Sequence, residues 1–432
     1  MIKKALENKD QNNFLHFVIM ANSANIGDYE QAHQSIQSIN DKTYKSAIAP
    51  LFEAWIYAAE NNKDEALKQL ETLKQEKSLH SFYYMHRGMI NDYFNDRESA
   101  QADFDTIIED KNLELSFRSL QIISNFYTRN SQQEKAKSLI EKYYNKNKKA
   151  KMLGELLKLT QKVDKERTLP IIDTPQKGLG EAIFNIGTVF RNYQNDIAHI
   201  FTALSLYLNP QNEAAVLSSA NLLEMNNRKN EAIKQYQKIN KDSSLYFTAS
   251  LKIATIYMEK KENKKALKQL EMLSNLYPDD YNVLFNLGEL NRVNGNHIEA
   301  IKYYNKALKH LPESLKNDWT IYYALGISYE KSNQWEKAED VLKQALKTSN
   351  RHPYILNYLG YMWLENNQNY NEALYMIFEA YQQNPESGHI MDSLGWALYR
   401  MGKYNDAIGV LEKAAEYLPS KAIVCDHLGD VD

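Results

Sequence analysis

Small apolar residues recur at a nearly constant step along the chain of 432 residues. Successive members of the series are 34 to 38 residues apart, apart from one step of 62 residues between Ala136 and Ala198. A period of this size predicts helix-turn-helix units that bury their apolar faces against their neighbours. The series, in which each alanine follows a polar turn, comprises Ala32, Ala66, Ala100, Ala136, Ala198, Ala232, Ala266, Ala300, Ala338, Ala373 and Ala407.

A second small residue lies about twelve positions upstream of the alanine in many units. Glycine inside a helix costs about 1 kcal/mol relative to alanine, so repeating it in register predicts that the two helices of a unit touch backbone to backbone there. Prolines separate some units, because proline cannot continue a helix interior. The small residues are Ala254, Gly288, Gly326, Gly360, Gly395 and Gly429, and the prolines are Pro278, Pro312, Pro385 and Pro419.

The six residues that end at each alanine share a polar turn. They read GDYEQA over 27–32, NNKDEA over 61–66, GNHIEA over 295–300 and GKYNDA over 402–407. With the period, these residues make the chain resemble tetratricopeptide repeat (TPR) proteins, weakly in the first four units and strongly from residue 181. The resemblance implies an all-α fold, a right-handed TPR-type superhelical solenoid of eleven units and part of a twelfth.

The C-terminal third carries a narrower likeness. The segments NYLGY (357–361), DSLGWALYRMG (392–402) and DHLGD (426–430) resemble a tetratricopeptide family common in alphaproteobacteria. Members of that family typically begin with an export signal and continue past DHLGD, whereas this chain starts MIKKALENKD and stops at Asp432. We therefore expect a shortened gene product whose last apolar residues lack a covering helix.

The step of 62 residues divides the predicted array. We expect an N-terminal array of about four divergent repeats over 1–145, an extra helix and a proline-containing linker over 146–180, and a C-terminal array over 181–432. The last array would hold about seven repeats and the first helix of another. Gly178 and Gly180 lack the residues of a phosphate-binding turn and are interpreted as a flexible start of the second array.

Composition and charge exclude several classes of function. Lys and Arg number 52 against 55 Asp and Glu, a net charge of −3, so no overall basic field attracts nucleic acid. No stretch approaches the roughly 20 apolar residues that cross a bilayer, so direct membrane insertion is not expected. As written, the chain is expected to be cytoplasmic, and a longer gene with an export signal would place it in the periplasm.

Catalytic and metal-binding patterns are missing from the sequence. The ten histidines never form HExxH, and none has zinc-type spacing to the single cysteine. Cys425 is expected to be a small buried side chain on an inward helix face, and His427, two residues away, to point elsewhere. We therefore expect no enzyme activity, metal or cofactor.

The other face of the first helices is the candidate binding surface. In tetratricopeptide arrays this face lines the concave groove, and carrying the positions over predicts a peptide-binding groove in the C-terminal array. Aromatic rings give contact area, amides can bond a peptide backbone, and arginine can bind a carboxylate. The predicted groove residues are Tyr323, Tyr354, Asn357, Tyr361, Asp392, Trp396, Tyr399 and Arg400.

One alternative stays open for this surface, and one class of ligand is rejected. Tyr361 and Trp396 could instead pack between adjacent units. The clamp of chaperone-binding domains is matched by Asn286 alone, which argues against a chaperone C-terminal peptide as ligand. The positions of that clamp that do not match are Leu251, Thr255, Thr320 and Ala324.

The sequence thus predicts a non-enzymatic scaffold that binds a protein or peptide segment in the groove of its C-terminal array. The alternative is a structural arm of a bacterial envelope-assembly or secretion complex, with contacts through the convex face and the ends. The sequence leaves the partner and the oligomeric state open.

Overall fold

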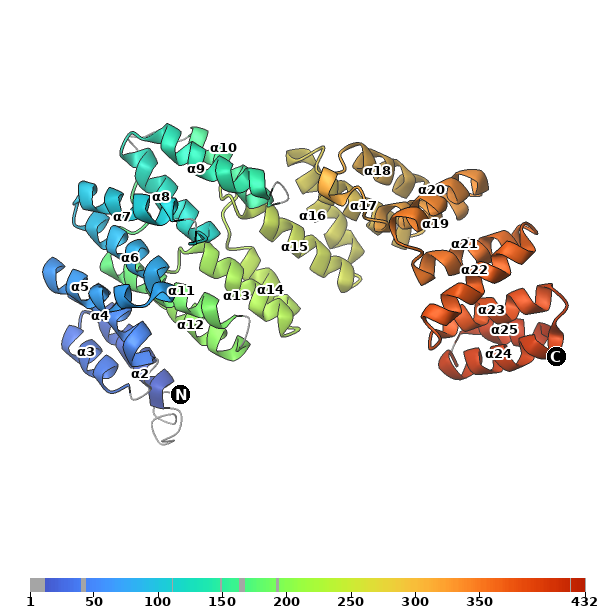
Figure 1. The fold of residues 1–432 in the computed structure, drawn as a ribbon, viewed down its shortest axis with the longest axis horizontal. Coiled ribbons are helices and arrows are strands. Elements are labelled where there is room, and N and C mark those ends of the chain that lie inside the picture. The colour runs from blue at the N-terminus through green and yellow to red at the C-terminus, as the bar shows by residue number, and fades with distance from the viewer. Residues whose placement is uncertain are drawn as a thin grey trace. The chain divides into compact units, whose positions relative to one another are not determined.

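The computed structural model describes residues 12–39, 44–110, 112–147, 150–162, 168–191, 194–419 and 421–431. Over these residues it contains 24 α-helices with short 3₁₀ and π segments and no strand, which confirms the predicted all-helical fold (Figure 1). The helices form two compact units, Met1–Ile256 and Tyr257–Asp432. The predicted boundaries at 145 and 180 stay a prediction.

The first unit consists mainly of antiparallel helix pairs. Its first helices α2, α4, α6 and α8 pair with α3, α5, α7 and α9, α10 packs on α8 and α9, and α11 pairs with α12 and α13 with α14. The α-helices are α2 (Asn12–Ile26), α3 (Tyr29–Gln37), α4 (Ala49–Ala59), α5 (Lys63–Leu70), α6 (His80–Tyr93), α7 (Arg97–Glu109), α8 (Phe117–Arg129), α9 (Gln133–Lys146), α10 (Lys151–Lys162), α11 (Pro175–Phe190), α12 (Asn195–Leu208), α13 (Glu213–Met225), α14 (Lys229–Tyr236) and most of α15 (Tyr246–Glu259).

The second unit continues the same alternation. Its pairs are α17 with α18, α19 with α20, α21 with α22, and α23 with α24, and α25 packs on α23 and α24. The helices are α16 (Asn263–Leu276), α17 (Tyr281–Val293), α18 (His297–Lys309), α19 (Thr320–Glu330), α20 (Trp335–Thr348), α21 (Pro353–Glu365), α22 (Tyr370–Gln383), α23 (Gly388–Arg400), α24 (Tyr404–Tyr417) and α25 (Ala422–Val431).

The turn inside each pair explains the polar motif before the alanine. In the units named below, the residue five positions before the alanine adopts a positive φ, a conformation that glycine and, to a lesser degree, asparagine accept at the lowest cost. The alanine itself lies fully buried in the second helix, where a larger side chain has no room. The residues with positive φ at this position are Gly27, Asn61, Asn95, Ser131, Asn227, Lys261, Gly295, Asn333 and Gly402.

The helical glycines pack differently from the prediction. A Cβ added to Gly288 would lie 2.5 Å from Cε1 of the Tyr304 ring, and one on Gly395 would lie 2.5 Å from Cγ of Leu411. The predicted backbone-to-backbone contact is wrong at Gly288, which makes room for a large side chain of the partner helix, whereas at Gly395 the carbonyl oxygen of Ala407 also lies 3.4 Å from the added Cβ. Backbone does approach at Gly360, where the added Cβ would lie 2.9 Å from the carbonyl oxygen of Ala373.

Candidate functional site

The predicted groove residues of the second unit lie on three successive first helices. Tyr354, Asn357 and Tyr361 follow one another at spacings of three and four on α21, which places them on one helix face. Asp392, Trp396 and Arg400 are spaced by four on α23, and Tyr323 lies on α19. We call the surface formed by the eight predicted residues the second groove.

His427 of α25 covers part of the second groove. Its Nδ1 lies 2.9 Å from Oδ1 of the buried Asp392, so the imidazole N–H donates to the carboxylate. Its ring stacks on the indole of Trp396, with centroids 4.3 Å apart. The Trp396 Nε1–H donates to Glu365 at 2.9 Å. Asp392 and Trp396 are therefore held by contacts within the fold.

Arg400 is likewise engaged by its neighbours. Its guanidinium donates to the amide oxygen of Asn367 and, at 3.1 Å, to the Tyr370 hydroxyl. It also lies over the Trp396 ring, 5.6 Å from the centroid. Tyr399 stacks on the same indole at 5.2 Å. These contacts tie α23 to the turn between α21 and α22.

The groove residues on α21, which are Tyr354, Asn357 and Tyr361, form the more open part of the second groove. The Tyr354 side chain is 48% exposed. The buried Oδ1 of Asn357 receives no hydrogen bond from any described residue. Tyr361 is half-buried, and burial raises the pKa of its hydroxyl to about 12. Tyr323 packs against Tyr358 with ring centroids 5.6 Å apart.

The expectation for Cys425 is wrong. Its side chain is exposed, whereas Val424 and His427, three residues apart, occupy the buried face of α25. The position inferred from sibling repeats is off because His427, and not Cys425, contacts α23. No sequence pattern shared between the repeats would have indicated the contact of His427 with α23.

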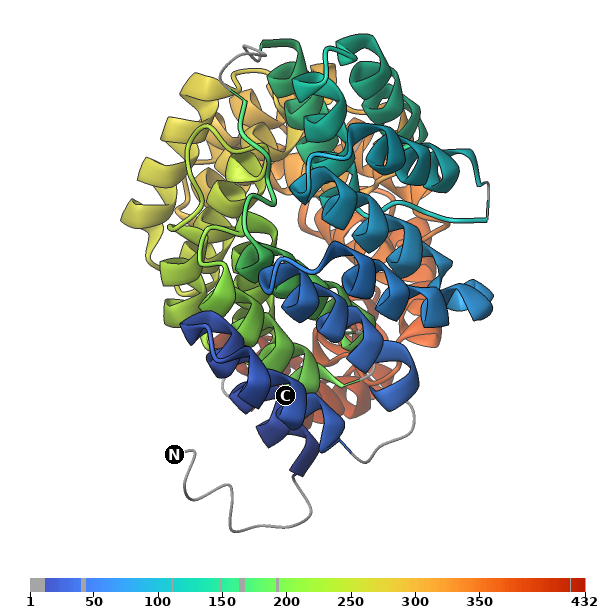
Figure 2. The ribbon, with the colours of Figure 1, turned by 90° about the vertical axis from the view of Figure 1, so that its left-hand side faces the viewer.

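A second polar surface in the first unit was missed from the sequence. Helix α11 packs on α4 and α6, which end 116 and 82 residues before it begins (Figures 1 and 2). A Cβ on Gly178 would lie 2.1 Å from Cζ3 of the Trp55 indole, and one on Gly180 would lie 3.3 Å from Cβ of Asn209. The interpretation of these glycines as a flexible start is therefore wrong, because both lie buried inside a helix at close contacts.

Two buried polar contacts accompany these glycines. Arg118 Nε of α8 lies 2.9 Å from Oε2 of Glu181, whose side chain is fully buried. Trp55 Nε1–H donates to Nδ1 of His86 at 2.9 Å, and the Asn185 amide lies 3.1 Å from Nε2 of the same ring. Because the indole only donates, His86 accepts at Nδ1 and is neutral. Complete burial lowers the pKa of His86 to about 3.

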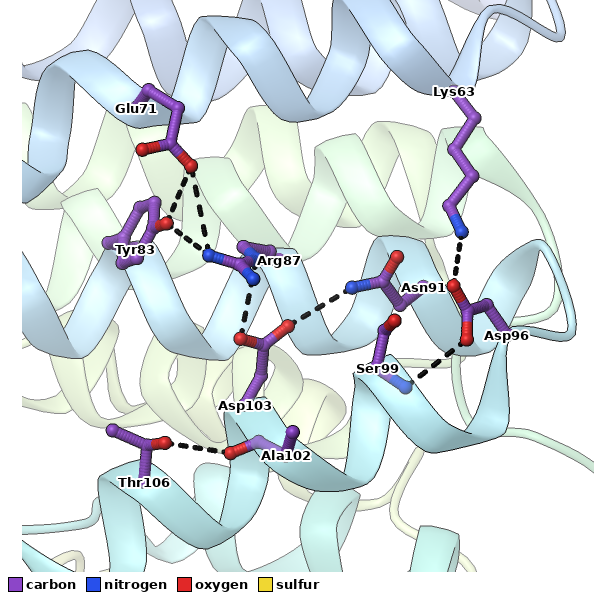
Figure 3. Close-up of polar contacts among 10 residues, drawn as sticks. All are labelled: Lys63, Glu71, Tyr83, Arg87, Asn91, Asp96, Ser99, Ala102, Asp103 and Thr106. Carbon is purple, nitrogen blue, oxygen red and sulfur yellow. Dashed lines mark hydrogen bonds and ion pairs between the residues drawn. The ribbon is translucent and has the colours of Figure 1, made fainter.

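An ionic network links α6 and α7 with the end of α5 (Figure 3). Tyr83 donates to Glu71 at 2.6 Å, and Arg87 donates to the Tyr83 hydroxyl and pairs with Asp103 at 3.3 Å. Asn91 donates to the second oxygen of Asp103 at 3.1 Å. Burial raises the pKa of Asp103 to about 6, although the Arg87 charge opposes this shift. The network joins structural elements, and its charges are satisfied within it.

The described residues contain neither a cluster of metal ligands nor a membrane-spanning helix. In that part of the chain, no group of three His, Cys, Asp or Glu side chains is arranged to hold a metal ion. None of its helices combines the length and the apolar character needed to cross a bilayer.

Sequence comparisons place the repeats in a known class. Tetratricopeptide repeat models match residues 248–280, 279–351 and 323–388. With the paired helices described above, these matches show that the chain contains tetratricopeptide repeats. Repeats of this class generally mediate protein–protein interactions and are typically non-enzymatic scaffolds. The narrower alphaproteobacterial resemblance stays a prediction.

The two related sequences and the solved structure named next each match part of this chain. A TPR repeat-containing protein of Pseudomonas aeruginosa is 26% identical over 220 residues, 50% of this chain and 36% of its own length. BBSome complex member BBS4 of Bos taurus is 32% identical over 132 residues, 30% of this chain and 24% of its own length. The matches thus span about a third or less of either relative. A solved tetratricopeptide repeat protein of Parabacteroides merdae aligns with a TM-score of 0.46 and 15% identity, over 58% of this chain and 98% of that one.

Proposed function

We propose that this protein is a non-enzymatic scaffold that binds a peptide segment of a partner protein in the second groove. The observation that carries the proposal is the amide of Asn357, a half-buried residue whose Oδ1 is covered and receives no hydrogen bond from the described residues. A buried acceptor without a donor costs about 1–3 kcal/mol, and this cost would be removed if the amide turned to the surface and accepted a backbone N–H of a bound peptide.

The neighbours of Asn357 support the same function. Tyr354 precedes it by three residues and is 48% exposed, so its ring offers apolar area to a ligand at a low cost in side-chain entropy. Tyr361 follows it by four residues on the same face and is half-buried. The ligand would contact α21 most directly, and Asp392, Trp396 and Arg400 would shape the adjoining wall through the contacts that hold them.

The test uses peptides selected from a random display library on the full chain. Asn357→Ala and Tyr354→Ala are each expected to weaken the selected peptides by about tenfold or more, which corresponds to about 1.4 kcal/mol of binding free energy. Titration calorimetry measures the affinity, and circular dichroism confirms that the helix content is unchanged.

Tyr375→Ala is the matched control. Tyr375 is 64% exposed and lies on α22, the second helix of the same pair, so its removal is expected to leave peptide affinity unchanged. Selected peptides that bind both α21 variants as tightly as the unaltered chain would place the binding surface elsewhere.

A further inference from the structure

One face of α11 meets three different first helices of the first unit. Gly178, Glu181 and Asn185 are spaced by three and four residues and therefore share a helix face. Gly178 lies against Trp55 of α4, Glu181 pairs with Arg118 of α8, and Asn185 lies beside His86 of α6. We call the surface that carries Trp55, His86 and Arg118 the first groove.

The first groove occupies the same repeat position as the second groove. Trp55 precedes the repeat alanine Ala66 by eleven residues, as Trp396 precedes Ala407. Both tryptophans directly follow a small buried residue, Ala54 or Gly395, and both lie on a first helix. Helix α11 therefore lies on the surface of the first array that corresponds to the predicted ligand surface of the second.

The contact between α11 and the first groove is selective. Gly178 leaves no room for a methyl group, because the Trp55 ring fills the space where a Cβ would lie. Glu181 is fully buried and would be strongly unfavourable without Arg118, since an unpaired buried charge costs several kcal/mol. His86 is fully buried between Trp55 and Asn185. The small size of Gly178, the charge of Glu181 and the hydrogen bonding of Asn185 thus each specify one position of α11.

We propose that the first groove is a helix-binding site whose occupant is α11 of the same chain, which closes this groove to outside partners. The helix that it accepts carries a small residue, a carboxylate three residues later and a carboxamide four residues after that. This inference rests on contacts within the first unit, so it stands whether or not the second groove binds peptide.

The experiment tests binding of a labelled peptide with the sequence of residues 172–190 to the full chain. In Gly178→Val, the branched side chain cannot share space with Trp55, so α11 leaves the groove and the peptide can enter. Fluorescence anisotropy is expected to show binding at least about tenfold tighter to Gly178→Val than to the unaltered chain. Gly409→Val is the control, because no described atom lies within 4 Å of a Cβ at that position, and it is expected to behave like the unaltered chain.

The peptide provides a second control. A peptide with the Glu181→Lys change places a positive charge against Arg118 and is expected not to bind Gly178→Val. Equal binding of the original peptide to the unaltered chain and Gly178→Val, or equal binding of both peptides to the variant, would overturn the proposal.

A chain cleaved in the linker covers the case in which Gly178→Val loses the fold of the first unit. A protease site inserted between Leu169, which is 75% exposed, and Pro170 allows the full chain to be folded and then cut. The fragments of the otherwise unaltered chain are expected to co-elute in size-exclusion chromatography, and excess peptide 172–190 is expected to reduce that co-elution. Separation of those fragments on cutting, or co-elution that excess peptide leaves unchanged, would contradict a groove that holds α11 as its ligand.

Discussion

Asp103 is a buried acidic side chain that is matched to specific partners. Asp103 is 3% exposed and contacts Arg87 and Asn91, yet burial still raises the pKa of its carboxyl to about 6. A carboxyl whose pKa is higher in the folded than in the unfolded chain binds a proton more readily when folded. Its contribution to stability therefore increases as the pH falls through 6 towards the unfolded pKa near 4.

The variant Asp103→Asn tests whether the carboxyl of Asp103 adds stability as the pH falls. The amide keeps an acceptor for Arg87 but does not titrate. Between pH 7 and pH 5, the unaltered chain is expected to gain about 1 kcal/mol of unfolding free energy relative to the variant. Urea titrations of both proteins at several pH values measure the difference. A difference that is constant with pH would show that Asp103 is ionised over the whole range.

The pKa shift of His86 has the opposite effect on the pH dependence of stability. Burial lowers the pKa of its imidazole to about 3, so the unfolded chain takes up a proton first and stability falls as the pH drops below about 6.5. Comparing Asp103→Asn with the unaltered chain cancels this contribution, because His86 is present in both proteins. The single-residue change therefore isolates the carboxyl.

At the scale of the helix pair, a glycine on the first helix receives a large side chain from the second. Gly395 of α23 and Gly409 of α24 allow a comparison within one pair. A Cβ on Gly395 would lie 2.5 Å from Cγ of Leu411, whereas no described atom lies within 4 Å of a Cβ on Gly409. The two glycines share a helical conformation and differ in the space around them.

The same substitution is expected to have opposite effects at these two positions. Gly395→Ala should destabilise the protein by about 1–3 kcal/mol, because overpacking displaces Leu411. Gly409→Ala should stabilise it by about 1 kcal/mol through helix propensity alone. Thermal unfolding followed by circular dichroism measures the direction of the stability change in both variants. A loss of stability at both positions would mean that space around Cβ does not decide the outcome.

At the scale of the whole molecule, the chain is divided into two compact units. In repeat arrays each helix pair contacts only its neighbours, so stability is approximately a sum of local terms. Helix α11 departs from this rule within the first unit, because it packs on α4 and α6 far upstream in the sequence. The first unit should therefore unfold more cooperatively than a simple array.

Hydrogen exchange can show whether a change in one helix pair affects only the neighbouring helices. Gly395→Ala is expected to speed amide exchange in α21 to α25, while exchange in α4, α6 and α11 stays unchanged. Mass spectrometry of peptic fragments resolves these segments. Faster exchange in α11 of this variant would reveal coupling that a nearest-neighbour description does not contain.

Most of the architecture follows from local patterns. The alanine period, the polar turns and the helical spacing determine the paired helices, because a left-handed turn residue and a buried small residue act within one unit. The candidate groove on α21 also follows from spacing, since Tyr354, Asn357 and Tyr361 must share a face of any regular helix. The periodic sequence is therefore sufficient for the elements and for the face that α21 presents, whereas it gave the wrong face for α25.

Contacts between distant segments depended on the tertiary structure. The sequence places Glu181 and Arg118 in different repeats, and their burial as a pair arises only because α11 leaves the regular stacking order. Likewise, His427 contacts Asp392 and Trp396 from α25. These two side chains are therefore held by the fold and do not project freely into the second groove. Periodicity describes neighbours along the chain, whereas burial and pairing of polar groups depend on which helices meet in space.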